Sequence, residues 1–239
     1  MPPKVDTEKQ FYQRLLTEAA QRPVSEARLI QWVHSGHCPR RVLRGMAASI
    51  LAGAAQFPPR LSALYQIATD PGVRLHILSN LLEECGIVPD AQHTLVACPE
   101  QRHVNWAITF AHACGLTEGQ ITACVTRPSA VYPAVDQAIA AGDWQYAWAY
   151  LACLELNVSR SYPFLIAGLL KSGFTAADIV FLSNHVTADA EHGQAGMMLV
   201  AQVSTGEEAR ARALQAVQSA ARHWWELYQG TGDSRRTRG

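Results

Sequence analysis

The stretch FLSNHVTADAEHGQAGMML, residues 181–199, carries two histidines and an aspartate at offsets of four and three, namely His185, Asp189 and His192. Because each residue of an α-helix turns the chain by about 100°, these three side chains fall within about 60° of one another. Glu191, the other acid in the stretch, points well away from them. The spacing fits either a hydrogen-bonded cluster in a core or one wall of a metal site, and the stretch alone leaves both open.

Helical patterns fill nearly the whole chain, many with Pro at the start and Gly at the end. No segment shows the alternation of β-branched and polar residues that a strand needs, and residues 87–98 are expected to form an extended loop. We therefore expect an all-α protein with a single domain at 1–230 and a disordered basic tail at 231–239. The predicted helices occupy residues 6–21, 25–36, 39–57, 58–69, 71–86, 99–115, 128–142, 143–156, 160–173, 176–202 and 207–230.

Composition excludes several classes of function. The chain has 20 basic and 20 acidic residues, so it offers no charge pattern for nucleic acid or for an anionic membrane surface. No apolar run reaches the roughly 18 residues that a membrane span needs. The six cysteines form no C-x-x-C pair, and the start of the chain, MPPKVDTEKQ, lacks the apolar core of a signal peptide. We expect a reduced, cytoplasmic protein.

If residues 181–199 form one wall of a metal site, other helices must supply the remaining ligands. Carboxylates and histidines on helical bundles usually bind two metal ions. A ferritin-like site needs two Glu-x-x-His motifs, and this chain offers only one, at residues 100–103, so that pattern fails. Better candidates are two glutamates in apolar helical patterns: Glu155, and Glu84 with Glu83 as its alternative.

Four motifs, NLLEECG, HVNWAITFAHACGLT, ACLELNV and HVTADAEH, resemble in this order those of the haem-oxygenase-like di-iron oxidases and oxygenases. These are relatives of pyrroloquinoline-quinone synthase and of the TenA/thiaminase II group, and the resemblance covers most of the chain, from about residue 40 to 228. It implies a haem-oxygenase-like helical bundle. It also favours His103 over the alternative His93, because Trp106 and Phe110 follow His103 as in the family's helix. The ligands implied for two Fe²⁺ ions are Glu84, His103, Glu155, His185, Asp189 and His192.

By this resemblance the chain is expected to be a non-haem di-iron oxidoreductase that uses O₂ to oxidise a small molecule in a biosynthetic pathway. We expect an amine or amino-acid-derived substrate that undergoes N-oxygenation or oxidative C–C or C–N cleavage. Three alternatives stay open: fatty-acid decarboxylation or desaturation, manganese in place of iron, and a metal-free oxidase, hydrolase or binding protein of the same fold. No motif supports Cys114 or Cys153 as a thiaminase-like nucleophile. An external electron donor and a homodimer, for which the helix around Trp224 and Trp225 is suitable, are left open as partners.

Overall fold

The computed structural model describes residues 6–230, and within this range the chain forms ten α-helices, three 3₁₀-helices and one two-stranded hairpin. The expected all-α class is confirmed. The hairpin corrects the expectation that no segment forms a strand. The tail at 231–239 lies outside the described residues. None of the described helices has the length and apolarity that a membrane crossing requires.

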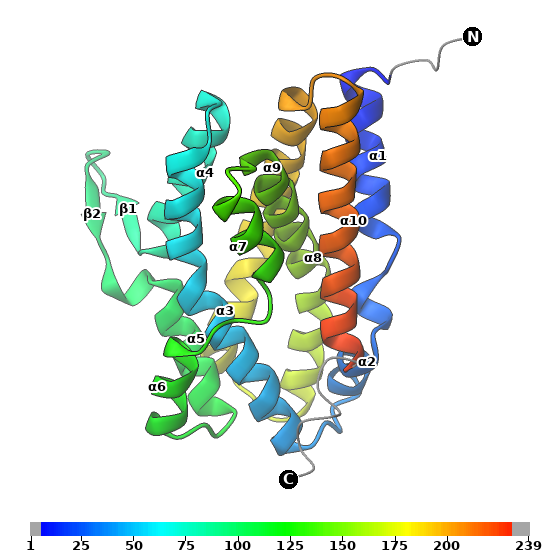
Figure 1. Ribbon diagram of the computed structural model, residues 1–239. Helices are drawn as coiled ribbons and strands as arrows, with labels where there is room; N and C mark the ends of the chain where they lie inside the picture. Colours follow the sequence, from blue (N-terminus) through cyan, green and yellow to red (C-terminus); the bar gives the residue numbers. More distant parts are fainter. Residues whose placement is uncertain (1–5, 231–239) are drawn as a thin grey trace. The chain divides into compact units, whose positions relative to one another are not determined.

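Two compact units make up the described chain, and Figure 1 labels their α-helices and strands. The first takes in the residues up to Gln31, Ala134–Phe164, and the chain from His185 onward; the second takes in Trp32–Pro133 and Leu165–Asn184. The boundaries between the units fall within helices α2, α7, α8 and α9, so each of these helices is divided between the two units. The expectation of a single domain stays a prediction. The elements represented in the first unit are α1 (Glu8–Ala20), η1 (Val24–Glu26), α2 (Arg28–His34), α7 (Pro133–Ala140), α8 (Trp144–Lys171), α9 (Val180–Val203) and α10 (Glu207–Gln229).

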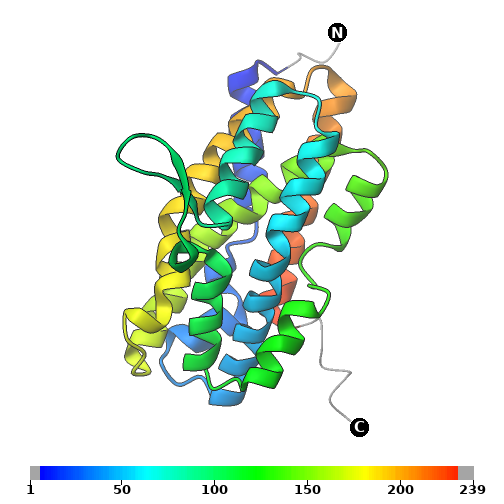
Figure 2. The same cartoon turned by 90° about the vertical axis from the view of Figure 1, so that its left-hand side faces the viewer.

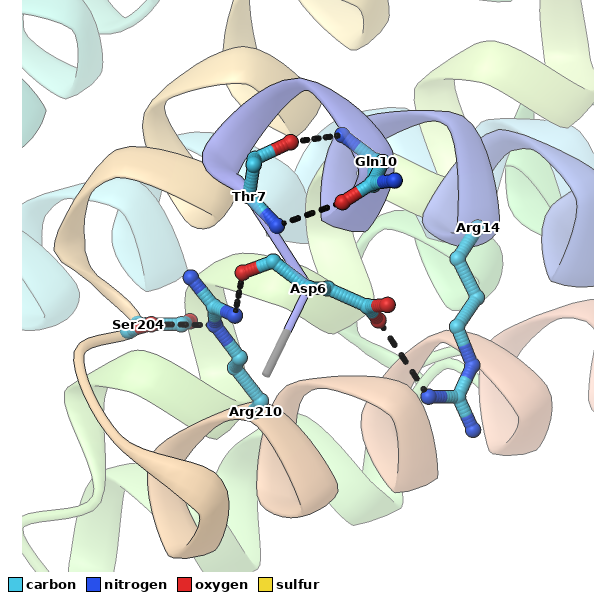
Figure 3. Close-up of polar contacts among 6 residues, drawn as sticks. All are labelled: Asp6, Thr7, Gln10, Arg14, Ser204 and Arg210. Carbon is cyan, nitrogen blue, oxygen red and sulfur yellow. Dashed lines mark hydrogen bonds and ion pairs between the residues drawn. The ribbon is translucent and has the colours of Figure 1, made fainter. Parts of the chain in front are cut away.

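In the first unit, α1 packs along α10, and a cluster of polar contacts fixes the start of α1 (Figure 3). Thr7 caps the helix: its hydroxyl accepts from the backbone N–H of Gln10, whose side chain accepts in turn from the backbone N–H of Thr7 at 2.8 Å. This reciprocal arrangement satisfies two backbone donors that the first helical turn leaves without partners. Arg210, at the start of α10, donates to the backbone oxygens of Ser204 and Asp6. The starts of α1 and α10 are thereby tied together.

In the second unit, α3 packs against α4, α5 and α6. The sequence predicts two helices separated at Pro58 and Pro59, and this is wrong: α3 runs unbroken through both prolines. The Arg60 side chain donates to the carbonyl of Gln56, and the Gln56 side chain contacts the backbone at Arg127 and Ser129. These bonds and the packing offset the backbone hydrogen bonds that the prolines remove. The remaining elements of this unit are α3 (Arg40–Ile67), α4 (Pro71–Glu84), β1 (Ile87–Pro89), β2 (Leu95–Ala97), η2 (Pro99–Gln101), α5 (His103–Ala113), α6 (Glu118–Thr126) and η3 (Ala177–Ile179).

Strands β1 and β2 form an antiparallel hairpin between α4 and α5, and Figure 2 shows it standing out from these two helices. Its turn is organised by Asp90, whose carboxylate accepts from the backbone N–H groups of Gln92 and Thr94, both at 2.9 Å. Three residues on each strand are too few to show the alternation by which strands are recognised, which explains why the sequence predicts a loop here.

Two further differences concern helices. Helix α8 is continuous through Pro163, where the sequence predicts two helices, and α6 forms in a segment for which no helix is expected. The signal for α6 is local: Thr117 and Gln120 make a capping box at its start. That pattern is visible in the sequence, although the helix that follows it has only nine residues.

Candidate metal centre

Glu84 and His103 form the candidate ligand pair of the second unit. Glu84 is the last residue of α4 and His103 is the first residue of α5, and both are buried. The distance between Oε1 of Glu84 and Nδ1 of His103 is 2.9 Å. Two ligands that each lie about 2.1 Å from one metal ion at a right angle are about 3 Å apart, so this distance suits a pair that shares an ion. It also suits an ion pair between the two side chains.

The backbone between these residues explains how they meet although 18 residues separate them in the sequence. Gly86 takes up a left-handed conformation with φ +66°, which ends α4 and turns the chain into β1. The backbone N–H of Cys98 donates to the carbonyl of Gly86 at 2.7 Å, so the hairpin closes on itself. An added Cβ at Gly86 would lie 2.5 Å from the Cys98 carbonyl oxygen. The chain therefore returns to the end of α4 just before His103.

The structure separates the two alternatives that the sequence leaves open for this pair. His93 is exposed in the turn of the hairpin, with φ 60°, and Glu83 is only half-buried. Glu100, the acid of the single Glu-x-x-His motif, is exposed. These positions favour Glu84 and His103, and the assignment of the pair as ligands stays a prediction.

The first unit carries the other four candidate ligands, on two helices. Glu155 lies on α8, and His185, Asp189 and His192 lie on α9. Glu155, His185 and Asp189 are buried and His192 is half-buried, whereas Glu191 is exposed. Helical geometry predicts this contrast between Glu191 and its neighbours.

A close contact between α8 and α9 fixes the level of these residues. An added Cβ at Gly193 would lie 2.7 Å from the backbone nitrogen of Leu156, and one at Gly196 would lie 2.8 Å from Cβ of Ala152. Only glycine permits helix backbones to approach so closely. The residue numbers rise along α9 as they fall along α8, so the two helices run antiparallel. Glu155 precedes Leu156 and His192 precedes Gly193. The two candidate ligands therefore lie at the same height along the α8–α9 helix pair.

An aromatic ring lies against one histidine in each unit. The rings of His103 and Trp106 are stacked, with centroids 4.9 Å apart and planes inclined by 22°. In the first unit, Tyr162 on α8 lies 6.5 Å from His185 on α9, centroid to centroid, and is itself buried. No motif in the sequence singles out Tyr162, although its spacing of seven from Glu155 places it on the same helix face.

The donor set fits iron. Three buried carboxylates and two buried histidines are present among the six candidates. A buried charge costs several kcal/mol unless it is paired or coordinates a metal. Carboxylate oxygens and imidazole nitrogens are the ligands that non-haem iron prefers. Glu84, Glu155 and Asp189 could supply the oxygens, and His103, His185 and His192 could supply the nitrogens.

Two buried cysteines bear on a different chemistry. Burial raises the pKa of Cys114 and of Cys153 to about 12 each. The attacking species in cysteine catalysis is the thiolate, so such thiols are inert at neutral pH. A thiaminase-like role for either residue gains no support.

Two further aromatic residues, Phe110 and Tyr150, lie in packed surroundings. Phe110 and Tyr150 are fully buried; Phe110 contacts Phe174 in the second unit, and Tyr150 contacts His223 in the first. Both behave as core residues. Trp106 is the exception, because its ring stacks on a candidate ligand.

Comparison with known proteins identifies the family. A family model described as iron-containing redox enzyme matches residues 44–225, which is most of the chain. The chain belongs to the iron-containing redox enzymes. Among curated proteins, none matches it at a significant level.

Solved structures agree with this family at the level of the fold. A TenA homolog from Pseudomonas syringae pv. tomato str. DC3000 superposes with a TM-score of 0.72 at 14% identity, and the match covers 94% of each chain. A domain of unknown function with a heme oxygenase-like fold, from Shewanella denitrificans OS217, has a TM-score of 0.60 at 16% identity and covers 97% of this chain and 98% of that one. The expected haem-oxygenase-like fold is thereby confirmed for this iron-containing redox enzyme.

Proposed function

We propose that this protein is a non-haem di-iron oxidase or oxygenase that uses O₂ to oxidise a small molecule. The observation that carries the proposal is the burial of three carboxylates together with two histidines in a family of iron-containing redox enzymes. Against two Fe²⁺ ions, the three carboxylates leave a residual charge of about +1, which a buried site with neutral imidazoles tolerates.

We assign one role to each part of the donor set. In the second unit, Glu84 and His103 would supply iron ligands. In the first unit, the ligands would be Glu155, His185, Asp189 and His192. Iron, when bound, supplies the site where O₂ is reduced. The carboxylates of Glu155 and Asp189 supply negative charge that favours Fe²⁺ and Fe³⁺ over monovalent ions. Trp106 and Tyr162 pack on the imidazoles, fix their orientation and exclude water from one side of each ring.

For the substrate we propose an amine or an amino-acid derivative, oxidised at nitrogen or cleaved at a C–C or C–N bond. This part of the proposal follows the family resemblance. The TenA likeness suggests a metal-free hydrolase as the rival function. The high pKa of the Cys114 and Cys153 thiols speaks against a hydrolase that uses either cysteine as nucleophile.

Anaerobic loading with Fe²⁺ tests the proposal. We expect about two iron ions per chain by elemental analysis, and O₂ uptake with a transient visible absorption when air is admitted. Glu84→Gln and Asp189→Asn should each lower the iron content, while Glu191→Gln, in the same stretch but exposed, should not. A protein that binds no iron and consumes no O₂ would be a metal-free member of the fold. Screening amines, amino acids and fatty acids for stimulated O₂ uptake then identifies the substrate class.

A further inference from the structure

Trp106 is half-buried and stacks on His103 in the second unit. We propose that its indole is an electron relay that protects the iron site when O₂ reacts in the absence of substrate. The inference rests on the proposed function, because it requires iron and O₂ at His103.

The geometry gives the relay a buried end and an accessible end. His103 is buried, and its Nδ1 lies 2.9 Å from the Glu84 carboxylate. Trp106 follows one turn later on α5, and its ring lies 4.9 Å from the imidazole in a nearly parallel stack. The half-buried indole therefore connects a candidate iron ligand to solvent through a single ring contact.

The side-chain chemistry suits this position. Indole is among the side chains that are most easily oxidised by one electron, whereas phenylalanine, which would pack equally well against an imidazole, is not. A ring needed only for packing could be any aromatic residue. Tryptophan at this place adds a redox function to the packing.

The relay moves one electron and one proton. The indole of Trp106 loses one electron, which passes through the His103 ring and reduces the oxidised site, and the indole N–H proton goes to water. A soluble one-electron reductant such as ascorbate then returns one electron and one proton to the indolyl radical, which restores tryptophan. Without a reductant, the indolyl radical forms a C–O bond with O₂ and becomes a peroxyl radical. One electron from a further Fe²⁺ ion and one proton from water convert it to a hydroperoxide, so the side chain keeps both added oxygen atoms.

Two other tryptophans provide internal controls in the same molecule. Trp144 and Trp225 are half-buried like Trp106, and neither stacks on a candidate ligand in the structure. Trp32 is more exposed, at 43%. Oxidation governed by solvent access alone should affect Trp32 most and the other three about equally.

The experiment exposes the Fe²⁺-loaded protein to isotope-labelled O₂ without substrate, followed by digestion and mass spectrometry. We expect labelled oxidation several-fold higher at Trp106 than at Trp144, Trp225 or Trp32, and suppression by ascorbate. Trp106→Phe should shift the damage to His103, whereas Trp106→Tyr, which keeps an oxidisable ring, should protect His103. This rescue distinguishes a relay from a packing role.

The outcomes separate the relay from the proposed function. Bound iron and O₂ uptake without preferential oxidation of Trp106 would overturn the relay alone. Equal damage to His103 in the Phe and Tyr variants would also overturn it. A chain that takes up no iron would overturn both.

Discussion

Glu155 is a buried carboxylate in a helix whose neighbouring residues are apolar and buried, from Ala147 to Leu156. A buried charge is costly unless it is paired or coordinates a metal, and we predict that Glu155 is a metal ligand. Glu155→Gln keeps the shape of the side chain but removes the charge that holds a cation. We expect iron affinity to fall at least about tenfold, the range seen even for residues that only support metal ligands. Iron titration followed by elemental analysis measures this.

The matched control is Glu191→Gln, because Glu191 is an exposed acid on α9. We expect its iron content and helix content to match those of the unchanged protein. If Glu155→Gln and Glu191→Gln bind iron equally well, Glu155 is not a ligand.

The buried thiols of Cys114 and Cys153 predict how stability depends on pH. The folded protein holds both thiols protonated up to about pH 12, whereas the unfolded chain ionises them near pH 9. The unfolded state therefore binds fewer protons above pH 9, and the free energy of unfolding should decrease as the pH rises. The slope is at most about 1.4 kcal/mol per pH unit for each thiol.

Urea unfolding at pH 8, 9 and 10 measures this slope. A variant with alanine at both cysteines should show a shallower slope over the same range. Identical slopes in the two proteins would mean that these thiols do not cause the loss of stability at alkaline pH.

The α8–α9 contact at Gly193 shows how an element positions the site. A methyl group there would lie 2.7 Å from the backbone of Leu156, so Gly193→Ala must push the helices apart. We expect a loss of stability of about 1–3 kcal/mol, as for other overpacked cores, together with weaker iron binding. Thermal unfolding and iron titration measure the two effects.

Gly45→Ala is the control for this change. Gly45 lies within α3, and no atom outside its own helix backbone lies within 4 Å of an added Cβ. Alanine is the better helix former, so this variant should be more stable by about 0.5–1 kcal/mol. Equal effects at the two glycines would mean that the close approach does not matter.

Among the elements, the sequence predicts best those with strong local signals. Helix α1, capped by Thr7, lies within the predicted range 6–21, and α10 follows the predicted range within a residue. The prediction fails at Pro58, Pro59 and Pro163, where tertiary packing keeps a helix continuous against the local preference of proline. It also fails at the hairpin, whose strands are held by contacts with each other.

At the scale of the whole molecule, bound iron should stabilise the folded state. A ligand that binds only the folded state raises stability by about 2.7 kcal/mol at a concentration a hundred times its Kd. We expect Fe²⁺ under anaerobic conditions to raise the melting temperature. Glu84→Gln in the second unit and Glu155→Gln in the first should each reduce this rise.

The double variant tests whether both residues serve the same site. The effects of two substitutions that act on the same bound group are not additive. The double variant should therefore lose little more of the iron-induced rise in melting temperature than the more severe single variant. Melting curves with and without metal, at equal protein concentration, give the comparison. Fully additive losses would place the two residues at independent sites.

The candidate site could be predicted from sequence only in part. Helical spacing predicts that His185, Asp189 and His192 share one face, and Glu155 is conspicuous in an apolar helix. The pairing of Glu84 with His103 could not come from spacing, because a hairpin of unpredicted form brings them together. Trp106 and Tyr162 show their contacts with histidines only in three dimensions.

The hairpin between Glu84 and His103 closes at its base through the bond between Cys98 and Gly86. Residues 87–97 project beyond that bond, and the length of this projection does not determine where the Glu84 and His103 side chains lie. Doubling the length of a flexible loop costs only about 0.6 kcal/mol. Residues 87–97 are therefore a natural site for protein engineering, where a recognition peptide or a fluorescent label could be grafted within a few residues of Glu84 and His103.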